Sequence, residues 1–166
     1  MKKTTIIALL SAFISLPANA AGGYVGVSLG SGQIDISGLN STTSLGFFGG
    51  YSFNENFSAE IAYYDFGSQD LAPGFTLKSS ALSMSGVGFL PINEQFSLFA
   101  KLGFASTSLD LTGFSTESNT DFTYGFGGQI NVNPQFAIRA GYDVYKVGSG
   151  VSVDQKLMSV GGLLRF

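Results

Sequence analysis

The stretch QFAIRAGYDVY, residues 135–145, alternates between apolar side chains and small, polar or charged ones. On an extended chain, one face carries Phe136, Ile138, Ala140, Tyr142 and Val144. The opposite face carries Ala137, Arg139, Gly141, Asp143 and Tyr145. A period of two residues is typical of a β-strand whose two faces meet different environments. The stretch therefore predicts a strand with an apolar environment on one side.

Seven further segments repeat this alternation along the chain. In order they are YVGVSLG (24–30), SLGFFGGYSF (44–53), FSAEIAYYDF (57–66), LKSSALSMSGVGFL (77–90), FSLFAKLGFAS (96–106), DFTYGFGGQINV (121–132) and KLMSVGGLLRF (156–166). In 77–90 the alternation changes parity, because Leu82 and Met84 lie on one face and Val87 and Phe89 on the other. We expect a β-bulge near Gly86 or Gly88 to reconcile the two halves of that segment.

The composition argues against an ordinary water-soluble domain. Charged residues make up 11% of the chain, against about 25% in soluble globular domains. No apolar run long enough for a membrane helix follows residue 20, and a chain that spans lipid without helices must close into a barrel. A soluble lipocalin-like barrel would present a charged face to water, whereas the polar face here is mostly Gly, Ser, Thr and Ala. We therefore predict an all-β fold, an eight-stranded antiparallel up-and-down transmembrane β-barrel.

The first twenty residues have the pattern of a secretory signal peptide. Lys2 and Lys3 precede an apolar stretch from Ile6 to Leu16, and Ala18-Asn19-Ala20 is a typical cleavage site. The alternative is a membrane anchor or a buried N-terminal helix. We expect residues 1–20 to be cleaved and residues 21–166 to form the barrel domain in the cell outer membrane of a Gram-negative bacterium. Cleavage leaves six basic against eleven acidic residues, a net charge of −5, and no nucleic-acid partner is predicted.

The connections between the predicted strands alternate in length. Tight turns are predicted at 54–56, 91–94 and 133–134, and longer polar loops at 31–43, 67–76, 107–120 and 146–154. Outer-membrane barrels place short turns on the periplasmic side and long loops outside. Aromatic residues near the strand ends are expected to form two interfacial belts, with Phe53, Phe57, Phe89, Phe96, Phe136 and Phe166 by the turns and Tyr63, Tyr64, Phe122, Tyr142 and Tyr145 by the loops.

The chain resembles the small eight-stranded outer-membrane barrels, above all the OmpA-like transmembrane domain, with OmpX-like and opacity-type barrels as close relatives. The resemblance rests on GGYSFNENFSAEIAYYDFG (49–67), LPINEQFSLFAKLGFA (90–105), GFGGQINVNPQFAIRAGYD (125–143) and SVGGLLRF (159–166). It implies that Val160, Leu164 and Phe166 form a signal for the outer-membrane assembly machinery. It also implies outer-membrane lipids and lipopolysaccharide as partners.

Four charged residues fall on predicted lumen positions: Glu60, Lys101, Arg139 and Asp143. Because a buried charge is costly unless it is paired, we expect these side chains to pair across the lumen. The resemblance implies an acid in the third strand and bases in the fifth and seventh, which three of the four match. Gln129 stands where the family often has a further acid, so a thinner network is expected. Such a network either plugs and rigidifies the barrel or acts as a gate or a selectivity filter for a small pore.

No catalytic site is predicted. The chain has no histidine and no Cys. One serine, Ser28, lies in a G-x-S-x-G stretch at residues 26–30, but that stretch falls inside a predicted strand and has no histidine to act as its base. No cofactor or metal site is predicted either, because acidic residues at calcium-loop spacing are missing. The sequence favours a structural role in membrane integrity, with a narrow pore for small solutes as an extension of it. The alternative is a surface adhesin or host-interaction protein that binds an unknown partner through four extracellular loops.

Overall fold

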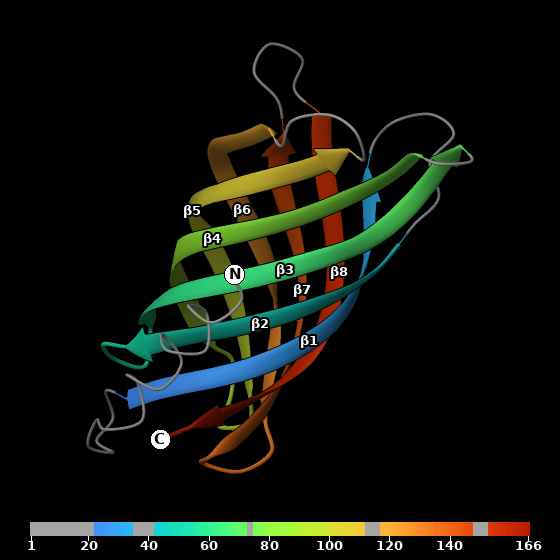
Figure 1. Cartoon of the computed structure of the whole chain (residues 1–166). Helices are drawn as coiled ribbons and strands as arrows, with labels where there is room; N and C mark the ends of the chain where they lie inside the picture. The colour runs from blue at the N-terminus through green and yellow to red at the C-terminus, as the bar shows by residue number, and fades with distance from the viewer. Residues whose placement is uncertain (1–21, 35–41, 73–74, 112–116, 148–152) are drawn as a thin grey trace.

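The computed structural model describes residues 22–34, 42–72, 75–111, 117–147 and 153–166. The predicted signal peptide lies outside these residues. The described chain forms a closed antiparallel barrel in which every strand pairs with its neighbours in sequence and β1 pairs with β8 (Figure 1). The strands are β1 (Gly22–Ile34), β2 (Thr42–Ser52), β3 (Phe57–Ala72), β4 (Phe75–Pro91), β5 (Phe96–Leu111), β6 (Glu117–Asn131), β7 (Phe136–Val147) and β8 (Val153–Arg165). This confirms the predicted fold class.

The two faces of the barrel wall differ in polarity in the way that the alternation predicts. Large apolar side chains cover the outside, and Met84, Phe104 and Met158 are each 65% exposed. The inside holds the buried polar residues, among them Ser28, Ser58, Glu60, Ser83, Lys101, Thr123, Gln129, Arg139 and Asp143. An apolar exterior around a polar interior suits a barrel surrounded by lipid. No helix long and apolar enough to cross a membrane occurs in the described residues.

The predicted bulge near Gly86 or Gly88 is wrong. Pairing of β4 with β3 is unbroken from Gly88 down to Ser80, and its pairing with β5 is unbroken throughout. Val87 is 1% exposed and points into the lumen, so the change of parity reflects large apolar side chains inside the barrel. The irregularity lies in β3 instead, where the register shifts between Asp65 and Ser68.

Gly67 makes the irregularity in β3 possible. Its φ of 74° lies in the left-handed region, which a residue with a Cβ rarely adopts. The Gly67 amide donates a hydrogen bond of 2.8 Å to the Asp65 carboxylate. A glycine in this conformation is typical of one common class of β-bulge.

The strands are longer than the sequence predicts, and the loops are correspondingly shorter. β3 continues to Ala72 and β4 begins at Phe75, so most of the predicted loop 67–76 is strand. β5 likewise reaches Leu111, inside the predicted loop 107–120. A tilted strand needs roughly 9–11 residues to cross the membrane, and β3, β4 and β5 have 16, 17 and 16. The strand ends carry polar residues and show no apolar alternation, so the sequence does not indicate that the strands continue.

The three short turns occur at the predicted places and share one hydrogen-bond pattern. The turn end of the barrel carries them at 53–56, 92–95 and 132–135. In the first, the Asn54 Oδ1 atom accepts hydrogen bonds of 2.9 Å from the Asn56 and Phe57 amides. Asn93 and Asn133 cap the second and third turns in the same way. We call the opposite end, where the undescribed segments connect the strands, the loop end.

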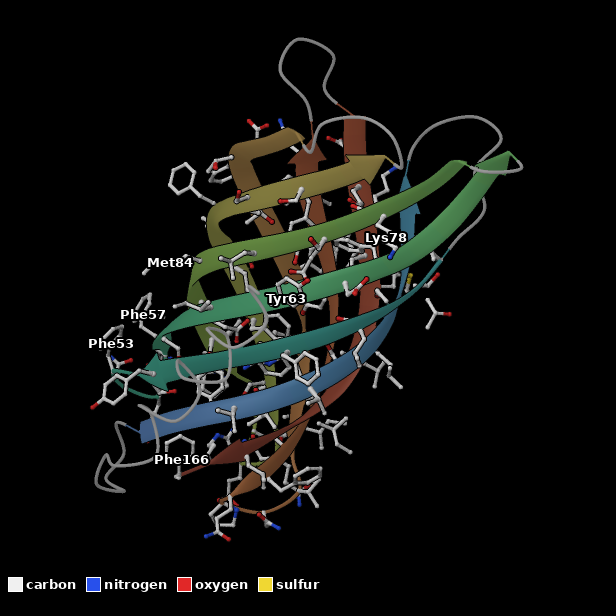
Figure 2. The ribbon with its side chains drawn as sticks, viewed as in Figure 1. Phe53, Phe57, Tyr63, Lys78, Met84 and Phe166 are labelled. Carbon is white, nitrogen blue, oxygen red and sulfur yellow. The ribbon has the colours of Figure 1, made fainter. Side chains whose placement is uncertain are left out.

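The predicted aromatic belts need a correction at three positions. Phe53, Phe57 and Phe166 lie on the outside toward the turn end (Figure 2). Tyr64 and Tyr145, however, are 3% and 2% exposed and point into the barrel. The Phe89 ring also faces inward, because it packs against the buried Phe99 ring at a centroid distance of 6.0 Å. These three side chains belong to the filling of the lumen.

Candidate functional site in the barrel lumen

The lumen charges come from three alternate strands. Glu60 lies on β3, Lys101 on β5, and Arg139 and Asp143 on β7, each on an inward-facing position. Small residues on neighbouring strands leave space for them. A Cβ on Gly125, the cross-strand neighbour of Asp143, would lie 2.9 Å from the Asp143 Cγ atom. The glycines of the polar face therefore make room for long charged side chains.

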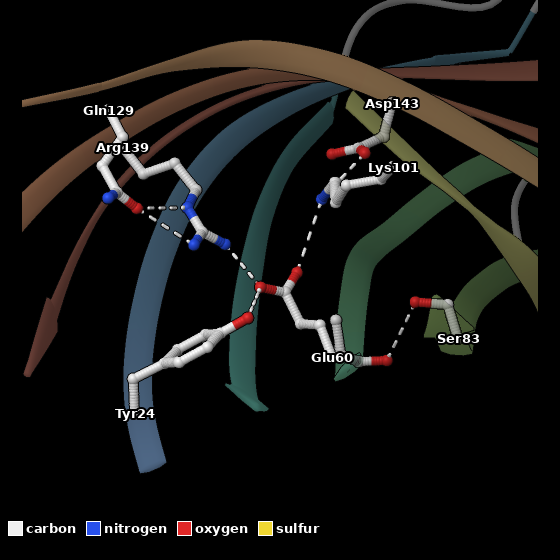
Figure 3. A network of polar contacts seen from close by, with 8 residues as sticks. Tyr24, Glu60, Ser83, Lys101, Gln129, Arg139 and Asp143 are labelled. Carbon is white, nitrogen blue, oxygen red and sulfur yellow. Dashed lines mark hydrogen bonds and ion pairs between the residues drawn. The ribbon is translucent and has the colours of Figure 1, made fainter. Parts of the chain in front are cut away.

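Glu60 and Arg139 form the centre of the network (Figure 3). The Arg139 Nη1 atom donates to Glu60 Oε2 in a direct ion pair. The Tyr24 hydroxyl donates a hydrogen bond of 2.8 Å to the same carboxylate oxygen. On its other side, Arg139 donates hydrogen bonds of 3.2 and 3.1 Å from Nε and Nη2 to the Gln129 Oε1 atom. Both groups of the central pair are thus held from two directions.

Lys101 extends the network to a second acid. Its Nζ atom lies 2.9 Å from Asp143 Oδ1 and 3.7 Å from Glu60 Oε1. Figure 3 shows Glu60 between the two cations. All four charged residues are less than 10% exposed, and their formal charges sum to zero. This neutrality matters, because an unbalanced charge in a medium of low polarity is costly.

Four aromatic rings surround the Arg139 guanidinium. Its Cζ atom lies 5.1 Å from the ring centroids of both Phe48 and Phe99, 5.4 Å from that of Tyr24 and 5.6 Å from that of Phe89. A planar guanidinium interacts favourably with aromatic rings at such distances. Arg139 is therefore fixed by its aromatic surroundings as well as by its ion pair.

The space left within this network is small. A cavity of about 10 Å³ is lined by the four charged residues and by neighbours that include Ser28, Tyr64 and Gly161, and this volume fits about one water molecule. Within the described part of the chain, the buried Asp143 Oδ2 atom has no hydrogen-bond partner. An ordered water in the cavity would supply the missing donor.

A second layer of side chains fills the lumen nearer the loop end. Tyr64, Phe66 and Tyr145 are all at most 3% exposed. Their ring centroids are separated by 5.8 to 6.3 Å. The lumen is thus filled at two levels, by the charge network and by this aromatic cluster.

The geometry above fits one known family of barrels. A family model described as the outer membrane protein beta-barrel domain matches residues 5–166. The chain belongs to this outer-membrane barrel family. A comparison with curated protein sequences gives no match.

Solved structures of other outer-membrane barrels share the fold. Ail, the attachment invasion locus protein of Yersinia pestis, has a TM-score of 0.65 at 20% identity over 88% of this chain and 97% of that chain. Neisserial surface protein A has a TM-score of 0.62 at 20% identity over 91% and 100% of the two chains. OprG of Pseudomonas aeruginosa has a TM-score of 0.62 at 14% identity over 90% and 98%. Identities this low show a common fold alone.

The structure of this outer-membrane barrel brings the four predicted lumen residues together and adds members that the sequence analysis missed. Gln129 stands where the OmpA-like family often has a further acid. Here it accepts hydrogen bonds from Arg139. Tyr24 and the rings of Phe48, Phe89 and Phe99 were not predicted to take part. The sequence pattern that indicates them is a large aromatic residue at an inward-facing strand position, among glycines and serines.

The residues of the predicted assembly signal lie on or directly after β8. Val160 and Leu164 are 59% and 55% exposed on the outside of the barrel. The Phe166 amide donates a hydrogen bond of 2.9 Å to the Gly23 carbonyl of β1. Recognition of these residues by the assembly machinery stays a prediction.

Proposed function

We propose that this protein is a closed structural barrel that strengthens the outer membrane and does not serve as a solute pore. The observation that carries the proposal is the filled lumen, in which the charge network leaves a cavity of about 10 Å³. A passage for hydrated ions or small solutes would require a continuous polar channel. The charges are better explained as a plug that is stable because it is electrically neutral and hydrogen-bonded.

The network also ties together strands that do not pair with one another. Tyr24 of β1 and Glu60 of β3 are joined by a hydrogen bond, and Glu60 is joined to Lys101 of β5 and Arg139 of β7. Gln129 of β6, a strand that pairs with β7, supports Arg139 from the side. These contacts brace the barrel wall from within, which is the property that a rigid membrane element needs.

The proposal and a pore make opposite predictions for cells that lack the protein. Loss of a closed structural barrel should raise the entry of a hydrophobic dye, and wild-type protein supplied in trans should restore the barrier. Loss of a pore should instead lower the uptake of small hydrophilic solutes. Reduced hydrophilic uptake in the deletion strain, without any rise in dye entry, would overturn the structural role.

The extended strands favour a second candidate function at the cell surface. β3 and β4 stay paired out to Ala72 and Phe75, farther than lipid contact requires. The solved relative Ail is named as an attachment invasion locus protein and was studied with the heparin analogue sucrose octasulfate. By sequence, however, the loop end of this chain is rich in acid, with Asp35, Asp65, Asp70, Asp110, Glu117 and Asp121. A cationic partner therefore suits this chain better than a sulfated polyanion.

Deletion of the loop-end extensions tests the surface role. A variant that lacks residues 68–77 and keeps a short turn should still assemble, because the deletion lies beyond the span that crosses lipid. Under the adhesin hypothesis it loses adherence to host cells. Unchanged adherence by a correctly assembled variant would exclude these extensions as the binding surface.

We also propose outer-membrane lipids and lipopolysaccharide as the surroundings of the barrel, and the outer-membrane assembly machinery as a transient partner. The apolar exterior, with Met84, Phe104 and Met158 as its most exposed residues, supports the lipid contact. We expect no enzymatic activity, because the chain has no histidine and its buried acids are paired with Lys101 and Arg139. Hydrolysis of lipid esters by the purified protein would contradict this expectation.

A further inference from the structure

Four phenylalanine rings near the turn end each lie against a glycine of a neighbouring strand. The distances are those from a Cβ built on the glycine to the nearest ring atom. A Cβ on Gly88 would lie 4.0 Å from Phe57, one on Gly128 would lie 3.1 Å from Phe96, one on Gly162 would lie 3.2 Å from Phe136, and one on Gly23 would lie 2.6 Å from Phe166. The ring of Phe166 is the most closely seated of the four.

These contacts occur at strand pairs that no turn connects at this end of the barrel. The short turns join β2 to β3, β4 to β5 and β6 to β7. The phenylalanine–glycine contacts join β3 to β4, β5 to β6, β7 to β8 and β8 to β1. Each of these pairs also has a backbone hydrogen bond at the same level, from Phe89 to Asn56, Asn131 to Gln95, Arg165 to Gln135 and Phe166 to Gly23, at 2.7 to 2.9 Å.

The pair of β8 and β1 differs from the others in one respect. β3 and β4, β5 and β6, and β7 and β8 are consecutive in sequence, so a chain segment joins each pair at the loop end. β8 and β1 are not consecutive, and only non-covalent contacts hold them together. The contact of Phe166 with Gly23 therefore has no covalent support at either end of the barrel.

Gly23 faces the outside of the barrel yet is buried, because the Phe166 ring covers it. Any side chain there would displace the ring, since a Cβ would come within 2.6 Å of it. We propose that the Phe166 ring packs into the space that Gly23 leaves free, and that this contact acts as a latch: it holds β8 and β1 together in the folded barrel. We call this non-covalent pair of strands the β8–β1 seam. The latch acts in the finished barrel, separately from any recognition of Phe166 during assembly.

To test the latch, purified protein is refolded into phosphatidylcholine vesicles without assembly machinery. Hydrogen exchange of its backbone amides is then measured. Gly23→Val and Phe166→Ala should each raise the exchange of β1 and β8 amides near the turn end by about tenfold, or about 1.4 kcal/mol. The double variant should exchange no faster than either single variant, because both remove the same contact. If Gly23→Val does not fold, Gly23→Ala and Phe166→Ala carry the same comparison.

Gly128→Val and Phe96→Ala serve as matched controls. They remove an equivalent contact between β5 and β6, which a chain segment also joins. Exchange of the β5 and β6 amides should therefore change by less than about twofold, within the usual error of such comparisons. Three results would each overturn the latch. The first is unchanged amide exchange at the β8–β1 seam in Phe166→Ala, and the second is additive effects in the double variant. The third is an increase in β5 and β6 amide exchange in the controls that equals the increase at the seam.

Discussion

At the scale of single residues, the two cations of the lumen network carry the same charge but have different surroundings. Arg139 lies among four aromatic rings and shares Glu60 with Tyr24. Lys101 has a looser arrangement, with one close contact to Asp143 and a longer one to Glu60. The two cations therefore have different roles, because one is enclosed by rings and the other bridges two acids.

The Tyr24 hydroxyl is the simplest of these contacts to test. Tyr24→Phe should lower the free energy of unfolding by about 1.5 kcal/mol, because a hydrogen bond to a charged group is lost while the ring stays. Urea unfolding in lipid vesicles measures the change. Tyr63→Phe is the matched control, since Tyr63 points outward. Equal effects of the two substitutions would argue against a special role for the Tyr24 hydroxyl.

The neutrality of the cluster gives a second prediction at this scale. Lys101→Met leaves Asp143 buried without its cation and should destabilise the barrel by about 3 kcal/mol. Adding Asp143→Asn restores a neutral cluster and should recover most of that loss. The comparison uses the same unfolding measurement on both variants. A double variant less stable than Lys101→Met would show that charge balance is not what holds these two residues.

At the scale of elements, each short turn is a unit in which an asparagine side chain caps two backbone amides. Asn93→Ala removes the acceptor for the Gln95 and Phe96 amides. By analogy with the loss of a helix cap, we expect a cost of about 1 kcal/mol. Glu94→Ala in the same turn should be close to neutral, because Glu94 is exposed. An equal loss in both variants, measured by urea unfolding, would contradict the capping role.

The strands show how far the sequence predicts the elements. Alternation in 135–145 and the other segments predicts eight strands, their order and their outward faces, because lipid imposes an apolar side at every second position. It fails where that rule does not apply. Val87 and Phe89 are apolar inside the lumen, so their parity suggested a bulge that β4 does not have. Beyond the lipid, the ends of β3 to β6 need no apolar face, so their sequence predicts loops.

The sequence predicts the charged residues of the candidate site but not how they pair. Glu60, Lys101, Arg139 and Asp143 stand out because charges are rare in this chain and fall on inward parity. Which acid pairs with which base depends on the stagger of the strands around the barrel, and one sequence does not fix that stagger. The aromatic partners of Arg139 were missed because aromatic residues are common on the outside, where they need no partner.

At the scale of the whole molecule, the barrel is a wall closed around a filled interior. The charge network occupies one level of the lumen, and the cluster of Tyr64, Phe66 and Tyr145 occupies another. Between charged residues the remaining cavity has about the volume of one water molecule. Membership of the outer-membrane barrel family places this wall in lipid, and the filled lumen is the basis for proposing that it acts as a barrier.

Ion conductance across a planar lipid bilayer tests this account most directly. Wild-type protein should give no stepwise currents, because its lumen is closed. Arg139→Ala removes the side chain at the centre of the plug and should produce discrete current steps. Lys78→Ala, which removes an exposed cation outside the lumen, should stay silent. Steady stepwise currents through the wild-type protein, unchanged in Arg139→Ala, would contradict the closed lumen.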